Sequence, residues 1–221
     1  MQLYDVMRTA FSAREFTADP VPDEVLARIF ENARFAPSGG NRQGGHVIVV
    51  RDAATKAAIA GLAAPAAKRY AAQVRAGEFP WNTIVPTALD AAAFAAMPAP
   101  PLLTETYIKA PVLLVVCVDL RVVASVDSEL DRIGVISGAS IYPLVWNILL
   151  GLRNEGYGGA LTTMPVMQEP ELQALLGLPA YVAVAAVLPA GRPVKQLTKL
   201  RRKAVAEFVT RERWGGTAFE G

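Results

Sequence analysis

The sequence predicts a single domain in which helices alternate with strands. Its 221 residues fit one domain, and a hydrophobic content of 52% allows a large core or a core with an oligomer interface. Apolar residues recur at helical spacing in several segments, whereas short apolar runs elsewhere indicate buried strands. We find no internal repeat and no second domain.

The first elements are predicted to be two helices with one apolar face each. A turn at residues 19–22 separates them, and the charged residues of the second helix lie mostly on the opposite side. The apolar faces consist of Leu3, Val6, Met7 and Ala10 in the first helix, and of Val25, Leu26, Ile29, Phe30 and Ala33 in the second.

Apolar runs predict strands at 46–50, 111–119 and 180–188, and a shorter strand at 160–163. The run at 180–188 carries no charge, which favours a central position in its sheet. Four further helices are expected: 55–76 with fraying near Pro65, about 130–153 with a disturbance near Pro143, 169–176 closed by Gly177, and 207–214 ending at Gly215-Gly216.

Residues 77–106 form a proline-rich insertion. The five prolines break any long helix, while Trp81, Phe94 and Met97 make the segment too apolar for a disordered linker. It is either a lid that folds over something or a surface excursion without a role.

Residues 133–152 contain no charged residue and are long enough to span a bilayer. Because they include glycines, Pro143 and Asn147, an interface helix explains them better than a membrane span. The N-terminus lacks the order of a signal peptide, and a net charge of +2 implies neither nucleic acid nor membrane binding. We therefore expect a cytoplasmic protein.

The scarcity of Cys and His excludes several kinds of chemistry. Cys117 and His46 are the only residues of their types, so a disulfide within the chain and a zinc site of His and Cys ligands are excluded. Cys117 lies in an apolar run where a thiol is inert, and neither a nucleophile elbow nor a Walker A loop is present. If the chain is an enzyme, we expect a cofactor to supply the reactive group.

Residues 36–45 form a glycine-rich turn between the second helix and the first strand. Glycines let the backbone pass close to a ligand, and Ser38, Asn41 and Gln43 offer hydrogen bonds to a polar, planar partner. An ordinary glycine-rich turn is the alternative.

The segment 192–203 is strongly basic. Six of its twelve residues are Lys or Arg and none is acidic. Such a run is either a solvated face or a phosphate site to which Arg14 could contribute. For Trp214 and Phe219, farther along, we expect docking onto the chain's own core or onto a partner subunit.

Four blocks along the whole chain resemble the FMN-dependent nitroreductase family, in the family's order. The second is the most specific, and the order and spacing of all four carry the resemblance. The blocks are 12–17 followed by 20–22; 33–43 followed by 47–50; 155–159 with its following strand; and the basic tail around 199–202.

The resemblance implies an α+β sandwich with a mainly antiparallel sheet flanked by helices. It also implies an intertwined homodimer with two FMN sites at the interface. The uncharged residues 133–152 would then form dimer core, since obligate interfaces resemble a domain core cut in half. The terminal segment would wrap the partner.

The resemblance also assigns cofactor contacts. Ser12 and Arg14 would approach the ribityl chain and pyrimidine edge, with Arg14 supplying positive charge near N1 and O2. The turn would line the flavin from the other subunit through Pro37, Ser38, Gly39 and Asn41, with Gln43 nearby. Gly158, Gly159 and residues 160–162, including Leu161, would run along the isoalloxazine, and Lys199, Arg201 and Arg202 would hold the phosphate.

Two departures from the family pattern affect this site. Ala10 and Phe11 stand where relatives carry Arg or a similar polar pair, so Arg8 or the tail must replace one phosphate donor. Gly44-Gly45 replaces the common Pro-Trp, which removes a bulky wall.

Gly156-Tyr-Gly-Gly159 is not a Rossmann motif, because Leu161 stands at the third glycine position.

The resulting hypothesis is a ping-pong oxidoreductase. NADH or NADPH would reduce FMN at N5 and leave, and an electron-poor acceptor such as a nitroaromatic or a quinone would then take the electrons. No side chain is required as a nucleophile. The alternatives are reductive dehalogenation or flavin breakdown on the same scaffold, an FMN-binding or storage protein without catalysis, and a basic-tailed interaction module without a cofactor.

Overall fold

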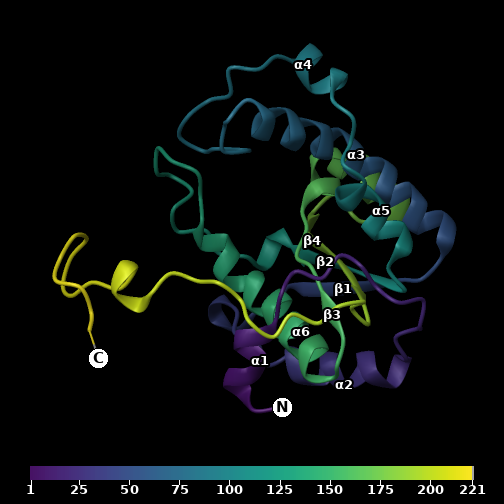
Figure 1. Ribbon diagram of the computed structural model, residues 1–221, viewed down its shortest axis with the longest axis horizontal. Coiled ribbons are helices and arrows are strands. Elements are labelled where there is room, and N and C mark those ends of the chain that lie inside the picture. The colour runs from purple at the N-terminus through teal and green to yellow at the C-terminus, as the bar shows by residue number, and fades with distance from the viewer. Residues whose placement is uncertain (221) are drawn as a thin grey trace.

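The computed structural model describes residues 1–220. A four-stranded antiparallel sheet lies between two helical layers (Figure 1). The strand order is β1 (Gly45–Val50), β2 (Val112–Asp119), β4 (Val182–Gly191) and β3 (Gly158–Gly159). The α-helices are α1 (Leu3–Thr9), α2 (Asp23–Ala33), α3 (Ala53–Arg75), α4 (Ala91–Ala96), α5 (Pro101–Lys109), α6 (Tyr142–Asn154) and α7 (Glu169–Leu176).

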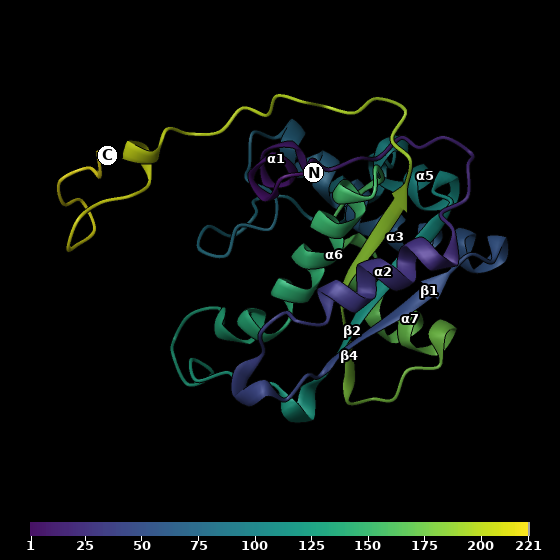
Figure 2. The same cartoon turned by 90° about the horizontal axis from the view of Figure 1, so that it is seen from below.

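The core divides at the sheet because alternate residues of a strand point to opposite faces. Val112, Leu114 and Val116 of β2 pack with α2 and α6 on one face. Leu113 and Val115 pack with α3, α5 and α7 on the other (Figure 2). β2 is buried on both faces, and β4 has a neighbour on each side, as expected for its uncharged run. The mixed α and β fold with an antiparallel sheet is confirmed.

Helix α3 differs from the expected frayed helix, since it continues without a break through Pro65. Proline removes one helical hydrogen bond and costs about 3 kcal/mol in a helix interior. Ala63, Ala66 and Ala67 are fully buried on both sides of Pro65, so packing against α5 and residues 164–168 keeps the helix intact.

The expected helix over 130–153 is wrong in its first half. Helix α6 begins at Tyr142, with Pro143 in its first turn, where a missing amide hydrogen has no cost. The preceding residues form a loop and a short 3-10 turn, η3 (Ile136–Ser140), and the apolar side chains of Ile133 and Val135 are exposed. Within residues 1–220, no helix is both long and apolar enough to cross a membrane.

The expected strand at 160–163 lies slightly earlier, at β3, and Thr162 of that run forms an isolated bridge with Val187 of β4. The helix closed by Gly177 is confirmed, because Gly177 takes a left-handed φ of 66° after α7. The insertion at 77–106 contains α4 and the first part of α5.

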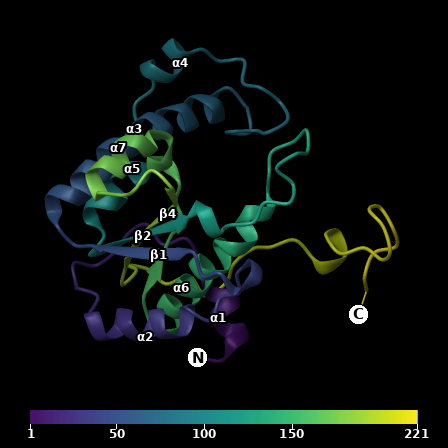
Figure 3. The ribbon, with the colours of Figure 1, turned by 180° about the vertical axis from the view of Figure 1, so that it is seen from behind.

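The C-terminal arm, defined as residues 197–220, extends away from the body in all views (Figure 3). The expected helix at 207–214 is wrong, since the arm contains only the short 3-10 turn η5 (Val205–Glu207) and a bridge between Thr210 and Ala218. A helix this short needs a surface to pack on, and residues 1–220 offer the arm none. Trp214 is fully exposed, so its docking onto the chain's own core is also wrong.

Candidate functional site

A cleft of about 130 Å³ lies where the N-terminal segment crosses β3, and we call it the glycine cleft. Its walls come from the segment after α1, one face of α6, the β3 strand and the start of the C-terminal arm. The lining residues are Ala10, Phe11, Ser12, Trp146, Leu149, Arg153, Tyr157, Gly158, Gly159, Leu161, Gln196 and Arg202.

The two glycines of β3 are required by close backbone packing. A Cβ atom on Gly158 would lie 2.8 Å from Cγ of Pro193, and one on Gly159 would lie 3.0 Å from the carbonyl oxygen of Pro189. Ser12 forms a parallel bridge with Gly159, and the Ala13 amide donates to the Gly159 carbonyl. The backbone floor of the cleft is therefore built into the sheet.

One amide of this floor is free to bind a ligand. The amides of Ala160 and Thr162 donate to carbonyls of β4, at Pro189 and Val187. The amide of Leu161 between them has no hydrogen-bond acceptor among residues 1–220. A planar ligand in the cleft would meet one backbone donor at this point.

Basic and amide side chains line one end of the cleft. Arg153, near the end of α6, donates through Nε to Oγ1 of Thr9 at 2.9 Å. Gln196 donates through Nε2 to the Thr9 carbonyl at 3.1 Å. Arg202 approaches from the C-terminal arm. Two guanidinium groups near one small cavity suit an anionic group such as phosphate.

A second cavity, the turn pocket, has a volume of about 280 Å³ and includes the glycine-rich turn. Gly40, Asn41 and Gln43 all have positive φ angles, of 60°, 54° and 52°, so the turn is unusually tight. The turn pocket is lined by Phe30, Arg34, Ala36, Pro37, Ser38, Gln43, Gly45, Val47, Ser140 and Leu144.

Two hydroxyl groups hold this turn. The Gln43 amide donates to Oγ of Ser38 at 2.9 Å. The Gly39 amide donates to Oγ of Ser140 at 2.9 Å, which links the turn to the loop before α6.

The bulky Pro-Trp pair of the family pattern does not fit at Gly44-Gly45, because a Cβ on Gly44 would lie 2.6 Å from Val122. The side chains of Val122 and Leu144 thus occupy the space that a bulkier pair at these two positions would need.

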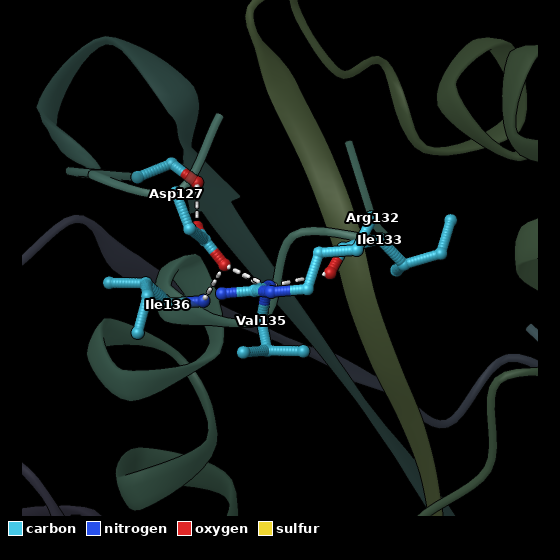
Figure 4. A network of polar contacts seen from close by, with 6 residues as sticks. Asp127, Arg132, Ile133, Val135 and Ile136 are labelled. Atoms are coloured by element: carbon cyan, nitrogen blue, oxygen red, sulfur yellow. Dashed lines mark hydrogen bonds and ion pairs between the residues drawn. The ribbon is translucent and has the colours of Figure 1, made fainter. Parts of the chain in front are cut away.

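The loop that carries Ser140 is organised by a buried carboxylate (Figure 4). Asp127 is only 3% exposed and accepts hydrogen bonds from the Val135 amide at 2.7 Å and from Arg132 Nη1 at 2.7 Å. Ser125 and the Ile136 amide also donate to it. These donors hold the pKa of Asp127 well below its usual range. The same hydrogen bonds use amides that a longer helix would have needed.

The structure divides the predicted site residues between these two cavities. Ser12, Gly158, Gly159, Leu161 and Arg202 line the glycine cleft. Pro37, Ser38 and Gln43 line the turn pocket, and Gly39 and Asn41 belong to the same turn without lining it. Arg14, Lys199 and Arg201 line neither cavity.

The two sets of residues do not meet within one chain. Helix α6 contributes Leu144 to the turn pocket and Leu149 and Arg153 to the glycine cleft, so the cavities lie near different ends of one helix. Arg14 does not line the cleft, although its Nη1 donates to the carbonyl of Ser12 at 3.4 Å. Each cavity is therefore only one part of the predicted site.

Arg153, Trp146 and Gln196 line the glycine cleft without having been predicted. The sequence contains one feature that could have indicated Arg153: it is a basic residue shortly before the glycines of β3. It also lies beside Ala10 and Phe11, where the family pattern lacks a donor. Arg8, the suggested replacement, does not line the cleft.

The buried titratable groups beside the sheet are unsuited to acid or base chemistry near pH 7. Burial raises the pKa of the Cys117 thiol to about 11, with a further contribution from Glu169, so the expected inert thiol agrees with the structure. Burial also raises the pKa of Tyr107 to about 12, despite its hydrogen bond with Thr162. Residues 1–220 contain no cluster of His, Cys, Asp and Glu that could hold a metal ion.

Known proteins are similar to this chain in sequence and in fold. Residues 7–192 match the Nitroreductase family. An NADH dehydrogenase of Thermus thermophilus is 31% identical over 188 residues, which is 84% of this chain and 83% of that protein.

Solved structures with the same fold are more distant in sequence. A BluB-like flavoprotein from Clostridium difficile matches with a TM-score of 0.73 and 23% identity, covering 96% of this chain and 100% of that one. Iodotyrosine deiodinase bound to FMN and 3-iodo-L-tyrosine matches with a TM-score of 0.68 and 22% identity, with the same coverage. At these identities the matches establish the fold alone.

The fold and the family match together define the class of protein. The sheet, the flanking helices and the match over residues 7–192 are those of a flavin-dependent oxidoreductase. The chain belongs to the nitroreductase family, as its sequence predicts.

Proposed function

We propose that this protein uses NADH or NADPH to reduce electron-poor small molecules, such as nitroaromatics or quinones, in a two-step exchange at one FMN. The observation that carries the proposal is the glycine cleft, in which a free amide and two guanidinium groups line a small cavity beside a backbone floor. FMN, when bound, supplies the two-electron chemistry by accepting a hydride equivalent from the nucleotide and passing it on.

The donors of the cleft fit this cofactor. The amide of Leu161 would donate to the ring system of the flavin, and the absence of side chains on Gly158 and Gly159 would let that ring system approach the backbone. Arg202 and Arg153 line the cleft and would bind the phosphate, with Arg153 supplying the donor that Ala10 and Phe11 lack. Arg14 adds positive charge beside Ser12, while Lys199 and Arg201 stay predictions.

The reaction balances without a nucleophilic side chain. NAD(P)H, one proton and a quinone give NAD(P)⁺ and the hydroquinone, and the same electrons with a nitro group give a nitroso group and water. The protein binds and orients the reactants, and its basic groups stabilise negative charge. A cleft walled by Trp146, Leu149 and Leu161 also limits access of water to the reacting atoms.

We further propose that two copies of the chain complete each site, with FMN between the glycine cleft of one copy and the turn of the other. The cleft alone is smaller than the roughly 300–1,000 Å³ typical of ligand pockets. Apolar side chains remain exposed on two helices: Leu3 is 64% exposed on α1, and Trp146, which lines the cleft, is 46% exposed on α6. Together with the extended C-terminal arm, these surfaces fit a homodimer interface.

The first test is the visible spectrum of the purified protein, before and after adding NADPH without oxygen. Flavin bands that bleach on addition support the proposal. Bands that persist with both NADPH and NADH indicate a binding or storage role. Absence of flavin, even after incubation with FMN, overturns the proposal.

A second test uses two defective variants to examine the shared site. Arg202→Ala impairs the cleft, and Ser38→Ala impairs the turn. If each site takes the cleft from one copy and the turn from the other, a mixed dimer contains one intact site and one doubly impaired site. Mixing therefore restores FMN binding in part. A site built within one chain predicts no restoration.

A further inference from the structure

A third cavity, of about 370 Å³, lies between the proline-rich insertion and the 3-10 turn η4 (Met164–Gln168). We call it the methionine pocket. Its lining contains one hydroxyl and no charged side chain. The lining residues are Ala66 of α3, Trp81 of the insertion, and Thr163, Met164, Val166 and Met167.

The methionine pocket lies close to the glycine cleft. Leu161 lines the cleft and Thr163 lines the pocket, so only Thr162 separates the two along the chain. Thr162 is firmly held, because its Oγ1 donates to the Val187 carbonyl at 2.8 Å and lies 2.7 Å from the Tyr107 hydroxyl. A ligand in the pocket would thus lie next to whatever occupies the cleft.

Trp81, which forms one wall of the pocket, is held against α3 by Arg69. The guanidinium of Arg69 lies 5.1 Å from the ring of Trp81 and 5.2 Å from that of Phe94. Nε of Arg69 is buried and has no hydrogen-bond partner within residues 1–220. Trp81 itself has a φ of 50°, a left-handed conformation that bulky residues rarely adopt and that tends to occur at ligand-binding sites.

A second set of contacts ties the insertion to α3. The Glu78 carboxylate accepts hydrogen bonds from Oγ1 of Thr87 at 2.6 Å, from the Ala88 amide at 2.9 Å and from Nε2 of Gln73 at 3.1 Å. Gln73 in turn accepts from the Trp81 amide at 3.3 Å. Both ends of the excursion around Trp81 are therefore anchored, which gives the pocket a permanent wall rather than a loose flap.

We propose that the methionine pocket binds the ring system of a planar, uncharged acceptor. The inference rests on the proposed function, since the reducible group must reach the glycine cleft. An indole face and two thioethers suit an aromatic ring, and methionine adapts to rings of different shape. Because no lining residue is charged, an acceptor carrying a carboxylate would lose its hydration without gaining a partner.

The test compares two acceptors on the protein as purified, without NAD(P)H, so that binding is measured apart from turnover. The probes are 2-methyl-1,4-naphthoquinone, which is uncharged, and 4-nitrobenzoate, which is anionic. We expect Trp81→Ala to weaken naphthoquinone binding about tenfold, since a large aromatic contact area is lost. Trp81→Phe keeps most of that affinity. Binding of 4-nitrobenzoate changes less than twofold.

Met167→Ala removes the opposite wall and tests the pocket even if the Trp81 variant fails to fold. Ile84→Ala is the matched control, because Ile84 belongs to the same excursion, is 83% exposed and does not line the pocket. In turnover, the KM for the naphthoquinone rises in both pocket variants and stays within twofold of its original value in Ile84→Ala.

The outcomes separate the pocket from the proposed function. Unchanged naphthoquinone affinity in both Trp81→Ala and Met167→Ala overturns the pocket assignment, even in a protein whose flavin is reduced normally. A protein that takes up no flavin even after incubation with FMN, but still binds the naphthoquinone through these residues, overturns the proposed function and supports the pocket.

Discussion

The glycine cleft and the turn pocket contain two parts of one predicted site, and the protein holds them in opposite ways. The floor of the cleft is backbone of the sheet, with Gly158 and Gly159 fully buried and bonded to β4 and to the N-terminal segment. The turn is exposed and depends on the hydroxyls of Ser38 and Ser140. We infer that the cleft is preformed in each chain, whereas the turn gains its final surroundings only against a partner.

The largest expected effect comes from filling the floor of the cleft. In Gly159→Val, the new side chain meets the Pro189 carbonyl oxygen at 3.0 Å and Leu149 Cδ2 at 3.1 Å. Overpacking of this kind costs roughly 1–3 kcal/mol. We expect a lower Tm and loss of flavin from the purified protein, measured by thermal unfolding and by the absorbance of bound flavin.

Gly61→Ala is the matched control for that substitution. Gly61 lies on α3, and no atom beyond its own helix is within 4 Å of an added Cβ. Alanine is a better helix former than glycine by about 1 kcal/mol, so this variant keeps its flavin and gains stability. Normal flavin content in Gly159→Val would contradict a cleft formed by close backbone approach.

The next largest effect is expected from Arg202→Ala. A hydrogen bond to a charged group contributes about 1.5–3 kcal/mol, which corresponds to roughly a ten- to hundredfold loss of FMN affinity. Lys203→Ala is the control, because Lys203 is equally basic, exposed and outside the cleft. Titration with FMN, followed by quenching of flavin fluorescence, measures both variants. Equal losses would show that the basic tail acts through its overall charge.

The sequence predicted this cleft better where a backbone requirement was visible than where a long side chain had to be placed. The glycines at 158 and 159 and the apolar strand at 111–119 each leave a local signature: the glycines line the cleft and the strand is β2, while contact of the glycines with a cofactor stays a prediction. Arg202 could not be distinguished from Lys199 and Arg201 by spacing, because the arm has no regular structure to orient alternate residues. Arg153 was missed because its role depends on the packing of α6 against Thr9.

The two wrong helices have a common physical cause. Residues 130–141 and 207–214 both have helix-compatible sequences, but neither lies against the core of its own chain. Around Asp127, the amides of Val135 and Ile136 bind a carboxylate instead of helical carbonyls. In the arm, no packing surface compensates for the entropy of helix formation. Sequence periodicity predicts a helix only where tertiary contacts are available to stabilise it.

Asp127→Asn tests how far order in that loop reaches the turn. Because the pKa of Asp127 is lowered in the folded protein, its stabilising effect is present above the unfolded pKa of about 3.9. It is lost only as the pH falls through the still lower folded value. The stabilisation of the loop by Asp127 should therefore not change between pH 5 and 8. In Asp127→Asn this stabilisation is missing across that range.

Hydrogen exchange of residues 123–141 measures this effect, with Asp131→Asn as a control on the same loop, where the carboxylate is exposed. We expect faster exchange at Val135 and Ile136 in Asp127→Asn, since an amide side chain cannot accept all the bonds of a carboxylate. FMN affinity should fall several-fold if the loop supports the turn. Faster exchange with unchanged affinity would separate the loop from the site.

The smallest expected effect comes from Ser140→Ala, which removes the link between the loop and the turn. The Gly39 amide loses its acceptor at 2.9 Å, but Gly39 is exposed, so water can replace the hydroxyl. A typical hydrogen bond contributes about 0.5–1.5 kcal/mol, so FMN affinity should fall by roughly two- to tenfold. Ser137→Ala is the control, since that serine makes no hydrogen bond with the turn among the described residues. An affinity loss as large as that of Arg202→Ala would mean that the turn is as rigid a part of the site as the cleft, and the contrast between the two regions would fail.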